Sequence, residues 1–279
     1  MTRNSFRDLF LKRLQPLYDA RECAAMLRWY VQDRLGIPYH QFLLDGAVEM
    51  SDDVDYLSDI ERLSQGEPLQ YVIGFTEFCG LRFHTDARAL IPRPETEELV
   101  EAVVAENVGL SGLKVLDIGT GTGAIAVSLA ARLDHAAVTA CDISADALSL
   151  AAENARQNAV QVHFEQCDIL HCEKLSGTYD IIISNPPYIP EKVRNTLHRN
   201  VVDFEPGIAL FVPDDQPLLF YDKIASLAVQ SLLPNGKLYF ETYEEYHPQL
   251  VAMLEGKGFA EVESRNDFYG RPRFVRAAR

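Results

Sequence analysis

The segment from 115 to 124 constrains the fold of this chain more than any other stretch, because an apolar run leads directly into three glycines and then into a helix-like pattern. It reads VLDIGTGTGA. Glycine lets the backbone turn sharply and lets a ligand approach it closely. In a parallel sheet, a turn of this kind after a strand lies in the crevice at the carboxyl ends of the strands, where cofactors bind. We therefore expect a cofactor loop made of Gly119, Thr120, Gly121, Thr122 and Gly123.

The chain from about residue 92 alternates between strand-like and helix-like patterns. A helix should begin at Pro94, because proline suits a first helical position. We then expect strands at 114–118, 137–141, 160–165, 180–184 and 236–241, and helices at 124–132, 144–158, 216–233 and 248–255. This alternation with short joints predicts a parallel sheet covered by helices on both faces. Two late β-prone segments, 260–264 and 273–276, predict a strand pair at one edge.

The first 66 residues instead predict short helices, which should pack as a bundle because a lone helix cannot bury an apolar stripe. The first helix has apolar residues at helical spacing: Phe6, Leu9, Phe10, Leu14 and Leu17. Asp19 and Glu22 form a capping box for a second helix, which should run to about Leu35. Ser51 would cap a third helix, with a buried face made of Val54, Leu57, Ile60 and Leu63.

Residues 67–91 change character and predict a junction between domains. Two β-prone runs, 76–78 and 81–83, flank Cys79-Gly80, which predicts a hairpin with Phe83 in its core. We therefore expect a helical bundle at 1–72, a β-hairpin linker at 73–91 and an α/β domain at 92–279.

Composition disfavours several classes of protein. Lys and Arg number 26 against 41 Asp and Glu, so the net charge is −15 and phosphate backbones are repelled at long range. The five cysteines lack CxxC spacing, and Cys167 and Cys172 beside His163 and His171 are interpreted as reduced thiols, so no metal site is expected. Charged residues interrupt the N-terminal apolar pattern, and no uncharged run reaches about 18 residues. We expect a cytoplasmic protein without signal peptide or membrane span.

The glycine loop alone leaves two cofactor classes open. Gly119, Gly121 and Ala124 match the G-x-G-x-x-[GA] fingerprint of nicotinamide dinucleotide sites. The loop also carries Asp117, and no Lys or Arg lies between 115 and 131. That setting suits the cationic sulfonium of S-adenosylmethionine (SAM) better than a pyrophosphate.

Two acidic residues follow the next two strands and would complete the cofactor site. Asp142, about 20 residues beyond the loop, could accept hydrogen bonds from ribose hydroxyls. Asp168 could accept a hydrogen bond from an adenine amino group.

A second motif, Asn185-Pro186-Pro187-Tyr188, ends the strand expected at 180–184 and should face the same crevice. Its two prolines stiffen the loop. The Asn185 side-chain oxygen and the Pro186 carbonyl oxygen could accept both N–H bonds of a planar NH2 group, and Tyr188 would cover that group with its ring. Held in this way, a weakly nucleophilic nitrogen is oriented toward a methyl donor. The nitrogen of an amide and that of an amino-substituted base both fit this pattern.

Taken together, these motifs resemble the HemK/PrmC family of glutamine N5-methyltransferases, which modify peptide chain release factors. The glycine loop is common to many SAM enzymes, and Asn-Pro-Pro-Tyr also occurs in adenine-N6 DNA methyltransferases. Their combination with an IPRPET run is specific. The resemblance covers nearly the whole chain and is carried by 66–71 (GEPLQY), 90–97 (LIPRPETE), 117–124, 185–188 and 204–206 (FEP).

The resemblance implies a seven-stranded SAM-dependent methyltransferase (Rossmann-like) domain behind a small helical N-terminal domain. It implies SAM as the cofactor and the glutamine of a release-factor Gly-Gly-Gln tripeptide as the substrate. The N-terminal bundle would contact this protein substrate. The alternatives that the residues leave open are an adenine-N6 nucleic-acid methyltransferase, and a nicotinamide oxidoreductase or non-catalytic nucleotide-binding module.

The resemblance also assigns roles by position. The cofactor would be held by Asp117, Gly119, Thr120, Gly121, Thr122, Gly123, Asp142, Asp168, Ile169 and Asn185. The substrate amide would be held by Asn185, Pro186, Pro187 and Tyr188, with Asn185, Pro186 and Tyr188 as catalytic candidates. Ile169 stands where some family members carry an aromatic residue, so apolar contact with adenine replaces a stack.

The remaining candidates are open between two interpretations. Arg93 and Glu95 could pair beside the substrate, although helix capping explains Glu95 equally well. His84, His198 and His247 are expected at the surface.

Overall fold

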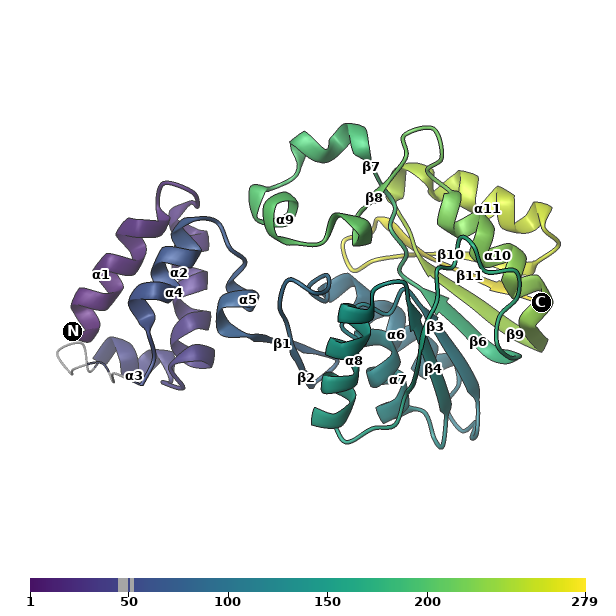
Figure 1. The fold of residues 1–279 in the computed structure, drawn as a ribbon, viewed down its shortest axis with the longest axis horizontal. Helices are drawn as coiled ribbons and strands as arrows, with labels where there is room; N and C mark the ends of the chain where they lie inside the picture. The colour runs from purple at the N-terminus through teal and green to yellow at the C-terminus, as the bar shows by residue number, and fades with distance from the viewer. Residues whose placement is uncertain (45–49, 51–52) are drawn as a thin grey trace. The chain divides into compact units, whose positions relative to one another are not determined.

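The computed structural model describes residues 1–44, 50 and 53–279. The chain divides into two compact units, coloured by residue number in Figure 1. One unit holds Met1–Phe75 and His198–Phe204, and the other holds Thr76–Leu197 and Glu205–Arg279. Each unit has a hydrophobic core of its own. The domain boundaries expected at residues 72 and 91 stay predictions.

The first unit is a bundle of short helices, as its apolar spacing predicts. Its elements are α1 (Arg3–Leu14), α2 (Ala20–Trp29), η1 (Tyr30–Arg34), α3 (Tyr39–Leu44), α4 (Tyr56–Ser64), α5 (Leu69–Ile73) and α9 (Arg199–Phe204). The capping box is confirmed, since Asp19 accepts a hydrogen bond from the backbone N–H of Glu22 and the Glu22 side chain accepts one from that of Asp19. The second helix ends in the π-helical turn η1. Here the Tyr30 hydroxyl donates to buried Asp59 at 2.7 Å.

The buried face of α4 differs from the expected one. Leu57 is 55% exposed, so its predicted burial is wrong. The helix begins after Asp55, which accepts a hydrogen bond from the backbone N–H of Ser58, and its buried side chains are Tyr56, Asp59, Ile60 and Leu63. The expected cap Ser51 lies outside the described residues. Leu17 is also exposed, because α1 ends at Leu14.

The second unit contains a sheet of seven strands within the described residues. The order is β10-β11-β9-β6-β3-β4-β5. Their bounds are β3 (Lys114–Ile118), β4 (Ala137–Asp142), β5 (His163–Gln166), β6 (Tyr179–Ser184), β9 (Leu232–Glu241), β10 (Ala260–Asn266) and β11 (Pro272–Ala278). Strands β3, β4, β5, β6 and β9 run parallel to one another. Strand β11 pairs antiparallel with β9 on one side and with β10 on the other, so β10 and β11 form the predicted strand pair at one edge.

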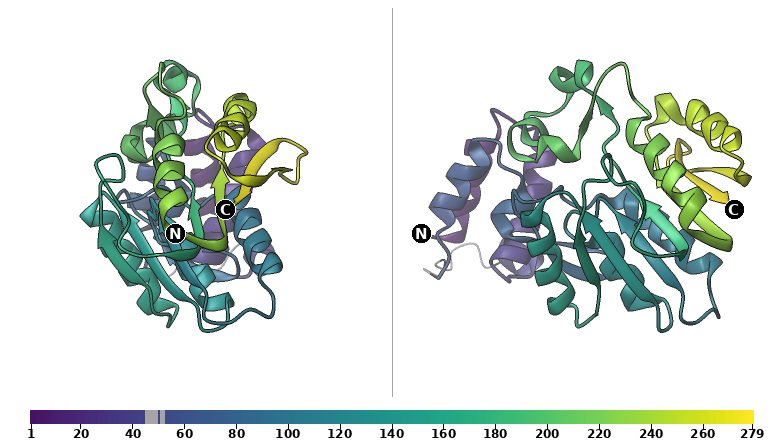
Figure 2. Two further views of the ribbon diagram at one scale, coloured as in Figure 1. Left: turned by 90° about the vertical axis from the view of Figure 1, so that its right-hand side faces the viewer. Right: turned by 45° about the vertical axis from the view of Figure 1, so that its right-hand side comes forward.

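Helices cover both faces of this sheet, as Figures 1 and 2 show. The covering helices are α6 (Pro94–Glu106), α7 (Ala124–Arg132), α8 (Ala145–Gln157), α10 (Leu219–Ser231) and α11 (His247–Gly256). One apolar cluster joins α6 and α7 to the sheet, and a second joins α10 and α11 to its other face. The predicted doubly covered fold is therefore confirmed. The strand β5 starts later than expected, at His163.

Short elements surround this core. The predicted hairpin is formed by β1 (Phe75–Phe78) and β2 (Leu81–His84), with Phe78 and Phe83 packed edge to face. The sequence patterns did not predict β7 (Ile189–Pro190), η2 (Glu191–Thr196), η3 (Gly207–Ala209), β8 (Phe211–Val212) and η4 (Glu244–Tyr246).

The expected surface position of His247 is wrong. This residue is buried, with Nδ1 2.7 Å from the Thr242 hydroxyl and Nε2 2.6 Å from the Ser264 hydroxyl. Burial lowers its pKa from the usual value, which favours the neutral ring.

Candidate active site

The two sequence motifs meet at the point where the strand order reverses. The chain runs from β3 outward through β4 and β5, and then returns to the other side of β3 with β6. The last residues of these central strands, Ile118 and Ser184, are direct partners in the ladder. The Ser184 hydroxyl donates to the Ile118 carbonyl oxygen at 2.6 Å. A switch point of this kind opens a crevice at the carboxyl ends of the strands.

A cavity of about 280 Å³ occupies this crevice and brings most of the predicted site residues together. Its size is near the lower end of small-molecule sites, which run from about 300 to 1,000 Å³. The predicted residues that line it are Gly119, Gly121, Asp142, Asp168, Ile169, Asn185, Pro186 and Pro187. The predicted residues outside its lining are Asp117, Thr120, Thr122, Gly123, Tyr188, Arg93 and Glu95.

The glycine loop takes a conformation that side chains disfavour. Gly119, Gly121 and Gly123 all have positive φ angles, of 74°, 55° and 81°. A Cβ atom at Gly123 would lie only 3.0 Å from the Cβ of Ala151 on α8. The glycines therefore allow the turn and its close packing on α8, and they leave bare backbone in the cavity wall.

Asp117, near the end of the strand before the loop, holds the loop by a buried hydrogen bond. It is fully buried and its Oδ2 accepts a hydrogen bond from the Thr120 hydroxyl at 2.6 Å. Desolvation raises the pKa of Asp117 to about 7, helped by the nearby charge of Asp142. Its position is that of a support for the loop.

The two acidic residues in the lining are already oriented by hydrogen bonds, Asp142 by backbone N–H groups and Asp168 by a histidine ring. Asp142 accepts hydrogen bonds from the backbone N–H of Gly121 at Oδ2 and from that of Ser144 at Oδ1, both at 2.9 Å. Asp168 lies 2.7 Å from His171 Nδ1, and this contact lowers the pKa of its carboxyl group. Each carboxylate oxygen has a second lone pair for a ligand hydroxyl or amine.

The Asn-Pro-Pro-Tyr corner is tied to α6 and β9. The Asn185 Nδ2 donates to the Thr96 hydroxyl at 3.3 Å, and that hydroxyl donates to Glu241 Oε2 at 2.6 Å. The Tyr188 hydroxyl donates to the other oxygen of Glu241 at 3.3 Å. Thr96 and Glu241 are buried.

Tyr188 therefore lies behind the corner instead of in the cavity lining. Its ring stacks on Tyr243, with centroids 5.9 Å apart. Desolvation, followed by the charge of Glu241, raises its pKa and keeps the phenol protonated.

Arg93 has a partner other than the expected one. Its Nη2 donates to Glu205 Oε1 at 2.6 Å, and the backbone N–H of Ile91 donates to Glu205 Oε2 at 3.1 Å. This contact replaces the expected pairing with Glu95, which lies in the first turn of α6. It joins the run at 90–97 to the FEP segment, and Leu90 and Pro206 from these two segments both line the cavity.

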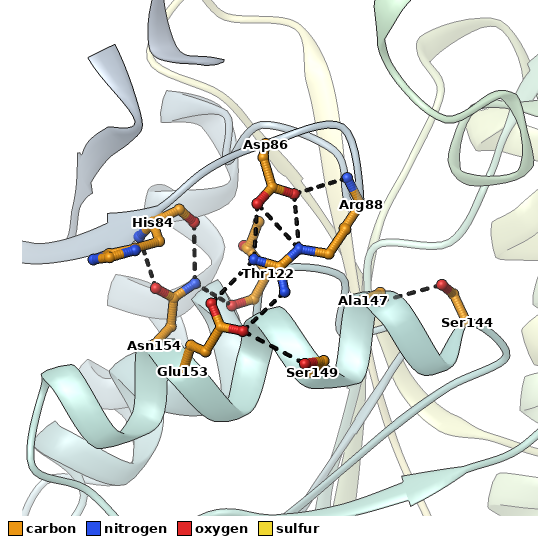
Figure 3. Close-up of polar contacts among 9 residues, drawn as sticks. All are labelled: His84, Asp86, Arg88, Thr122, Ser144, Ala147, Ser149, Glu153 and Asn154. Atoms are coloured by element: carbon orange, nitrogen blue, oxygen red, sulfur yellow. Dashed lines mark hydrogen bonds and ion pairs between the residues drawn. The ribbon is translucent and has the colours of Figure 1, made fainter. Parts of the chain in front are cut away.

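Sequence reasoning missed one wall of the cavity, formed by Arg88, Ala89 and Leu90. Figure 3 shows how polar contacts hold this segment against α8. Arg88 donates to Asp86 and, through both terminal nitrogens, to Glu153 at 2.9 and 3.0 Å.

Asn154, on the same helix, ties the wall to the glycine loop (Figure 3). It accepts a hydrogen bond from the His84 backbone N–H and donates to the carbonyl oxygens of His84 and Thr122. The charged residues around 86–90 are typical of a surface loop, so the local sequence did not predict that this segment lines the cavity.

A second set of missed lining residues is apolar. Phe220 and Ile224 come from α10, and Ile208 and Ala209 come from η3. Phe220 and Ile224 have the spacing of ordinary core residues of a helix, and no sequence signal distinguishes any of the four.

The lining fits SAM. Bare glycine backbone, oriented carboxylates and apolar walls are present together. Among the lining residues the cationic side chain is Arg88, whose guanidinium is already engaged by two carboxylates. Because the remaining charged groups in the lining are acidic, the cavity favours a cation over a pyrophosphate.

Comparison with known proteins agrees with this geometry. A family model described as the methyltransferase small domain matches residues 95–204, and one described as the PrmC N-terminal domain matches residues 10–74. The chain is 38% identical to a release factor glutamine methyltransferase of Flavobacterium psychrophilum, over 98% of this chain and 97% of that protein. It is 40% identical to one of Bacteroides thetaiotaomicron, over 95% of this chain and 96% of that protein.

Among solved structures, the chain is similar to the 16S rRNA N2 methyltransferase RsmC of T. thermophilus, in complex with AdoMet and guanosine. The TM-score is 0.53 at 18% identity, over 74% of this chain and 49% of that chain. At this identity the likeness shows the fold alone.

Proposed function

The chain belongs to the release factor glutamine methyltransferase family, and on that premise we propose that it transfers a methyl group from SAM to the side-chain amide nitrogen of a glutamine in a peptide chain release factor. The target is the glutamine of a Gly-Gly-Gln tripeptide. One observation carries the proposal: the glycine loop and the Asn-Pro-Pro corner line the same cavity.

The cofactor side of the cavity is built by the glycine loop and the two oriented carboxylates. SAM, when bound, supplies an activated methyl group. Of the residues that line the cavity, Gly119 and Gly121 would hold its methionine part through their backbone, Asp142 would accept hydrogen bonds from its ribose, and Asp168 and Ile169 would contact its adenine. Asp117 and Thr120 support this loop through their mutual hydrogen bond.

The substrate side orients a weak nucleophile. An amide nitrogen attacks poorly because its lone pair is delocalised into the carbonyl group. Asn185 Oδ1 and the Pro186 carbonyl oxygen accept its two N–H bonds and fix the face that reacts. The two oxygens also stabilise positive charge that develops on this nitrogen. No strong base is needed, because the nitrogen becomes acidic once it has been alkylated and then releases a proton to solvent.

The substitution Asn185→Ala tests this assignment. Methyl incorporation into release factor should fall by about 10²–10³-fold, the usual effect of removing one such electrostatic contact. SAM affinity, measured by calorimetry, should stay nearly unchanged. The matched control is Asn158→Ala, which removes a similarly half-buried amide whose hydrogen bonds go to Arg82 and Asn154 and which lies outside the cavity. Comparable turnover by Asn185→Ala would refute the role of Asn185. A wild-type protein that binds SAM without methylating release factor would refute the proposed function.

The same proposal makes release factor, a cytoplasmic protein, the partner and excludes a nucleic-acid substrate. A net charge of −15 supports this, since proteins that extrude a base must also grip phosphates. Within the described residues, the structure has no helix that combines the length and the apolar composition needed to cross a bilayer.

The N-terminal unit is proposed to contact the release factor. It exposes large apolar side chains that include Trp29 at 52% and Leu44 at 82%. Because Trp29 is exposed, Trp29→Ala should raise KM for release factor and leave the fold and SAM affinity intact. An unchanged KM for this variant would argue against the contact at this residue.

A further inference from the structure

The orientation of the Asn185 side chain is fixed by groups outside the cavity. A side-chain amide has two ends, an oxygen that accepts hydrogen bonds and an NH2 that donates them. In this structure the NH2 end donates to the Thr96 hydroxyl at 3.3 Å. Within the described part of the chain, Oδ1 of Asn185 takes no hydrogen bond, and Asn185 itself lines the cavity.

The Thr96 hydroxyl enforces this orientation because it has only one hydrogen. That hydrogen is used at 2.6 Å on Oε2 of Glu241. The hydroxyl oxygen can then only accept, so the Asn185 end that faces it must be the donor, Nδ2. A flipped Asn185 would place two acceptors against each other and lose the contact.

Glu241 is itself held in place. Glu241 is the last residue of β9 and is only 1% exposed. Its Oε1 accepts a hydrogen bond from the Tyr188 hydroxyl. The Tyr221 hydroxyl donates a hydrogen bond to the backbone carbonyl oxygen of Glu241 at 3.0 Å. Desolvation raises the pKa of Glu241, while Thr96 and the positive charge of Arg273 oppose that shift. The Glu241 carboxylate, which sets the direction of the hydrogen bonds from Asn185 to Thr96 and from Thr96 to Glu241, is therefore held rigidly.

We propose that Thr96 and Glu241 are positioning residues that lock the Asn185 oxygen toward the substrate and so make the site select a side-chain amide over a carboxylate. The inference rests on the proposed function and adds a basis for substrate choice. An amide NH2 can donate to the locked oxygen. A carboxylate has only acceptors, so a glutamate in the same place would face Oδ1 with like partial charge and no hydrogen bond.

The test uses Thr96→Val, which keeps the shape of the side chain and removes the hydroxyl. Without the lock, Asn185 can turn its NH2 end into the cavity. We expect kcat for release factor to fall about tenfold, as for one lost hydrogen bond, with SAM affinity unchanged. Binding of a release factor whose target glutamine is replaced by glutamate, measured as the competitive inhibition constant Ki, should instead tighten.

The ratio of Ki for the glutamate form to KM for the glutamine form is the decisive readout, since a merely structural defect would not shift it. Thr96→Ser restores the hydroxyl and should restore both kcat and the ratio. Thr96→Ala replaces Thr96→Val if the valine variant does not fold. Tyr239→Phe is the matched control, because it deletes another hydroxyl–carboxylate bond of β9, the 2.7 Å contact with Glu106, away from the cavity. It should lower stability without changing the ratio.

The outcomes separate the two proposals. A folded Thr96→Val or Thr96→Ala variant with a wild-type ratio overturns the locking role, whether or not its kcat falls. A wild-type enzyme that leaves release factor unmethylated in the same assay overturns the proposed function. A lower kcat and a lower ratio that serine restores support the lock.

Discussion

The buried carboxyl group under the glycine loop should make the stability of the second unit depend on pH. Desolvation raises the pKa of Asp117 from 3.8 to about 7. Between these values the unfolded chain has released the proton and the folded chain retains it. The wild type therefore loses stability as pH rises through this window, by about 1.4 kcal/mol per pH unit. Over the full window of about three units, the loss is about 4 kcal/mol.

The substitution Asp117→Asn removes the titration and keeps the shape of the side chain. An asparagine oxygen can still accept the hydrogen bond from Thr120. The unfolding free energy of the variant, relative to the wild type, should rise by about 2 kcal/mol between pH 5.5 and pH 7 and then level off above about pH 7.5. His247, whose lowered pKa makes both proteins less stable as pH falls, cancels in this difference.

The assay must report on the second unit. The single tryptophan, Trp29, lies in the first unit, so its fluorescence is unsuitable. Hydrogen exchange of the β3 amides in the absence of SAM, followed by mass spectrometry from pH 5.5 to pH 8.5, gives the local opening free energy. A difference between the two proteins that does not change with pH would refute the assigned protonation of Asp117.

Two further substitutions test how the cavity walls are held. Asn154→Ala removes three hydrogen bonds of a fully buried side chain and should lower the unfolding free energy by about 3 kcal/mol. It should also weaken SAM binding in calorimetry, because the hydrogen bonds that connect His84 to Thr122 through Asn154 are lost. Unchanged SAM affinity in a folded Asn154→Ala protein would show that the tie is dispensable. Glu205→Gln leaves one acceptor oxygen and puts an NH2 group against the other donor, either Arg93 or Ile91, so it should cost about 1–3 kcal/mol in the same exchange measurement. A loss near zero would mean that the two segments stay together without this carboxylate.

The elements of the fold that carry strong local patterns were predictable. The apolar run before the glycines and the start of α6 at Pro94 lie where their local sequence places them. The crevice shared by the two motifs also followed, because it depends only on parallel strands ending at one edge. The face of α4 was predicted only in part: Ile60 and Leu63 are buried as expected, whereas Tyr56 and Asp59 are buried and Leu57 is exposed.

The supports of the site could not be predicted from the sequence. Thr96 and Glu241 are 145 residues apart, and Arg93 and Glu205 are 112 apart. No periodicity or turn signal connects such pairs, since the contact arises only when α6, β9 and the segment after α9 are packed. The same reason applies to Arg88–Leu90, whose local sequence resembles an exposed loop and which tertiary contacts turn into a cavity wall.

The most direct measurement is a crystal structure of this enzyme with S-adenosylhomocysteine and a glutamine-containing Gly-Gly-Gln peptide. We predict the nucleoside against Asp142 and the glutamine nitrogen within hydrogen-bond distance of both Asn185 Oδ1 and the Pro186 carbonyl oxygen. A glutamine amide bound away from this corner, or an Asn185 that faces it with Nδ2, would contradict the proposed function of this corner.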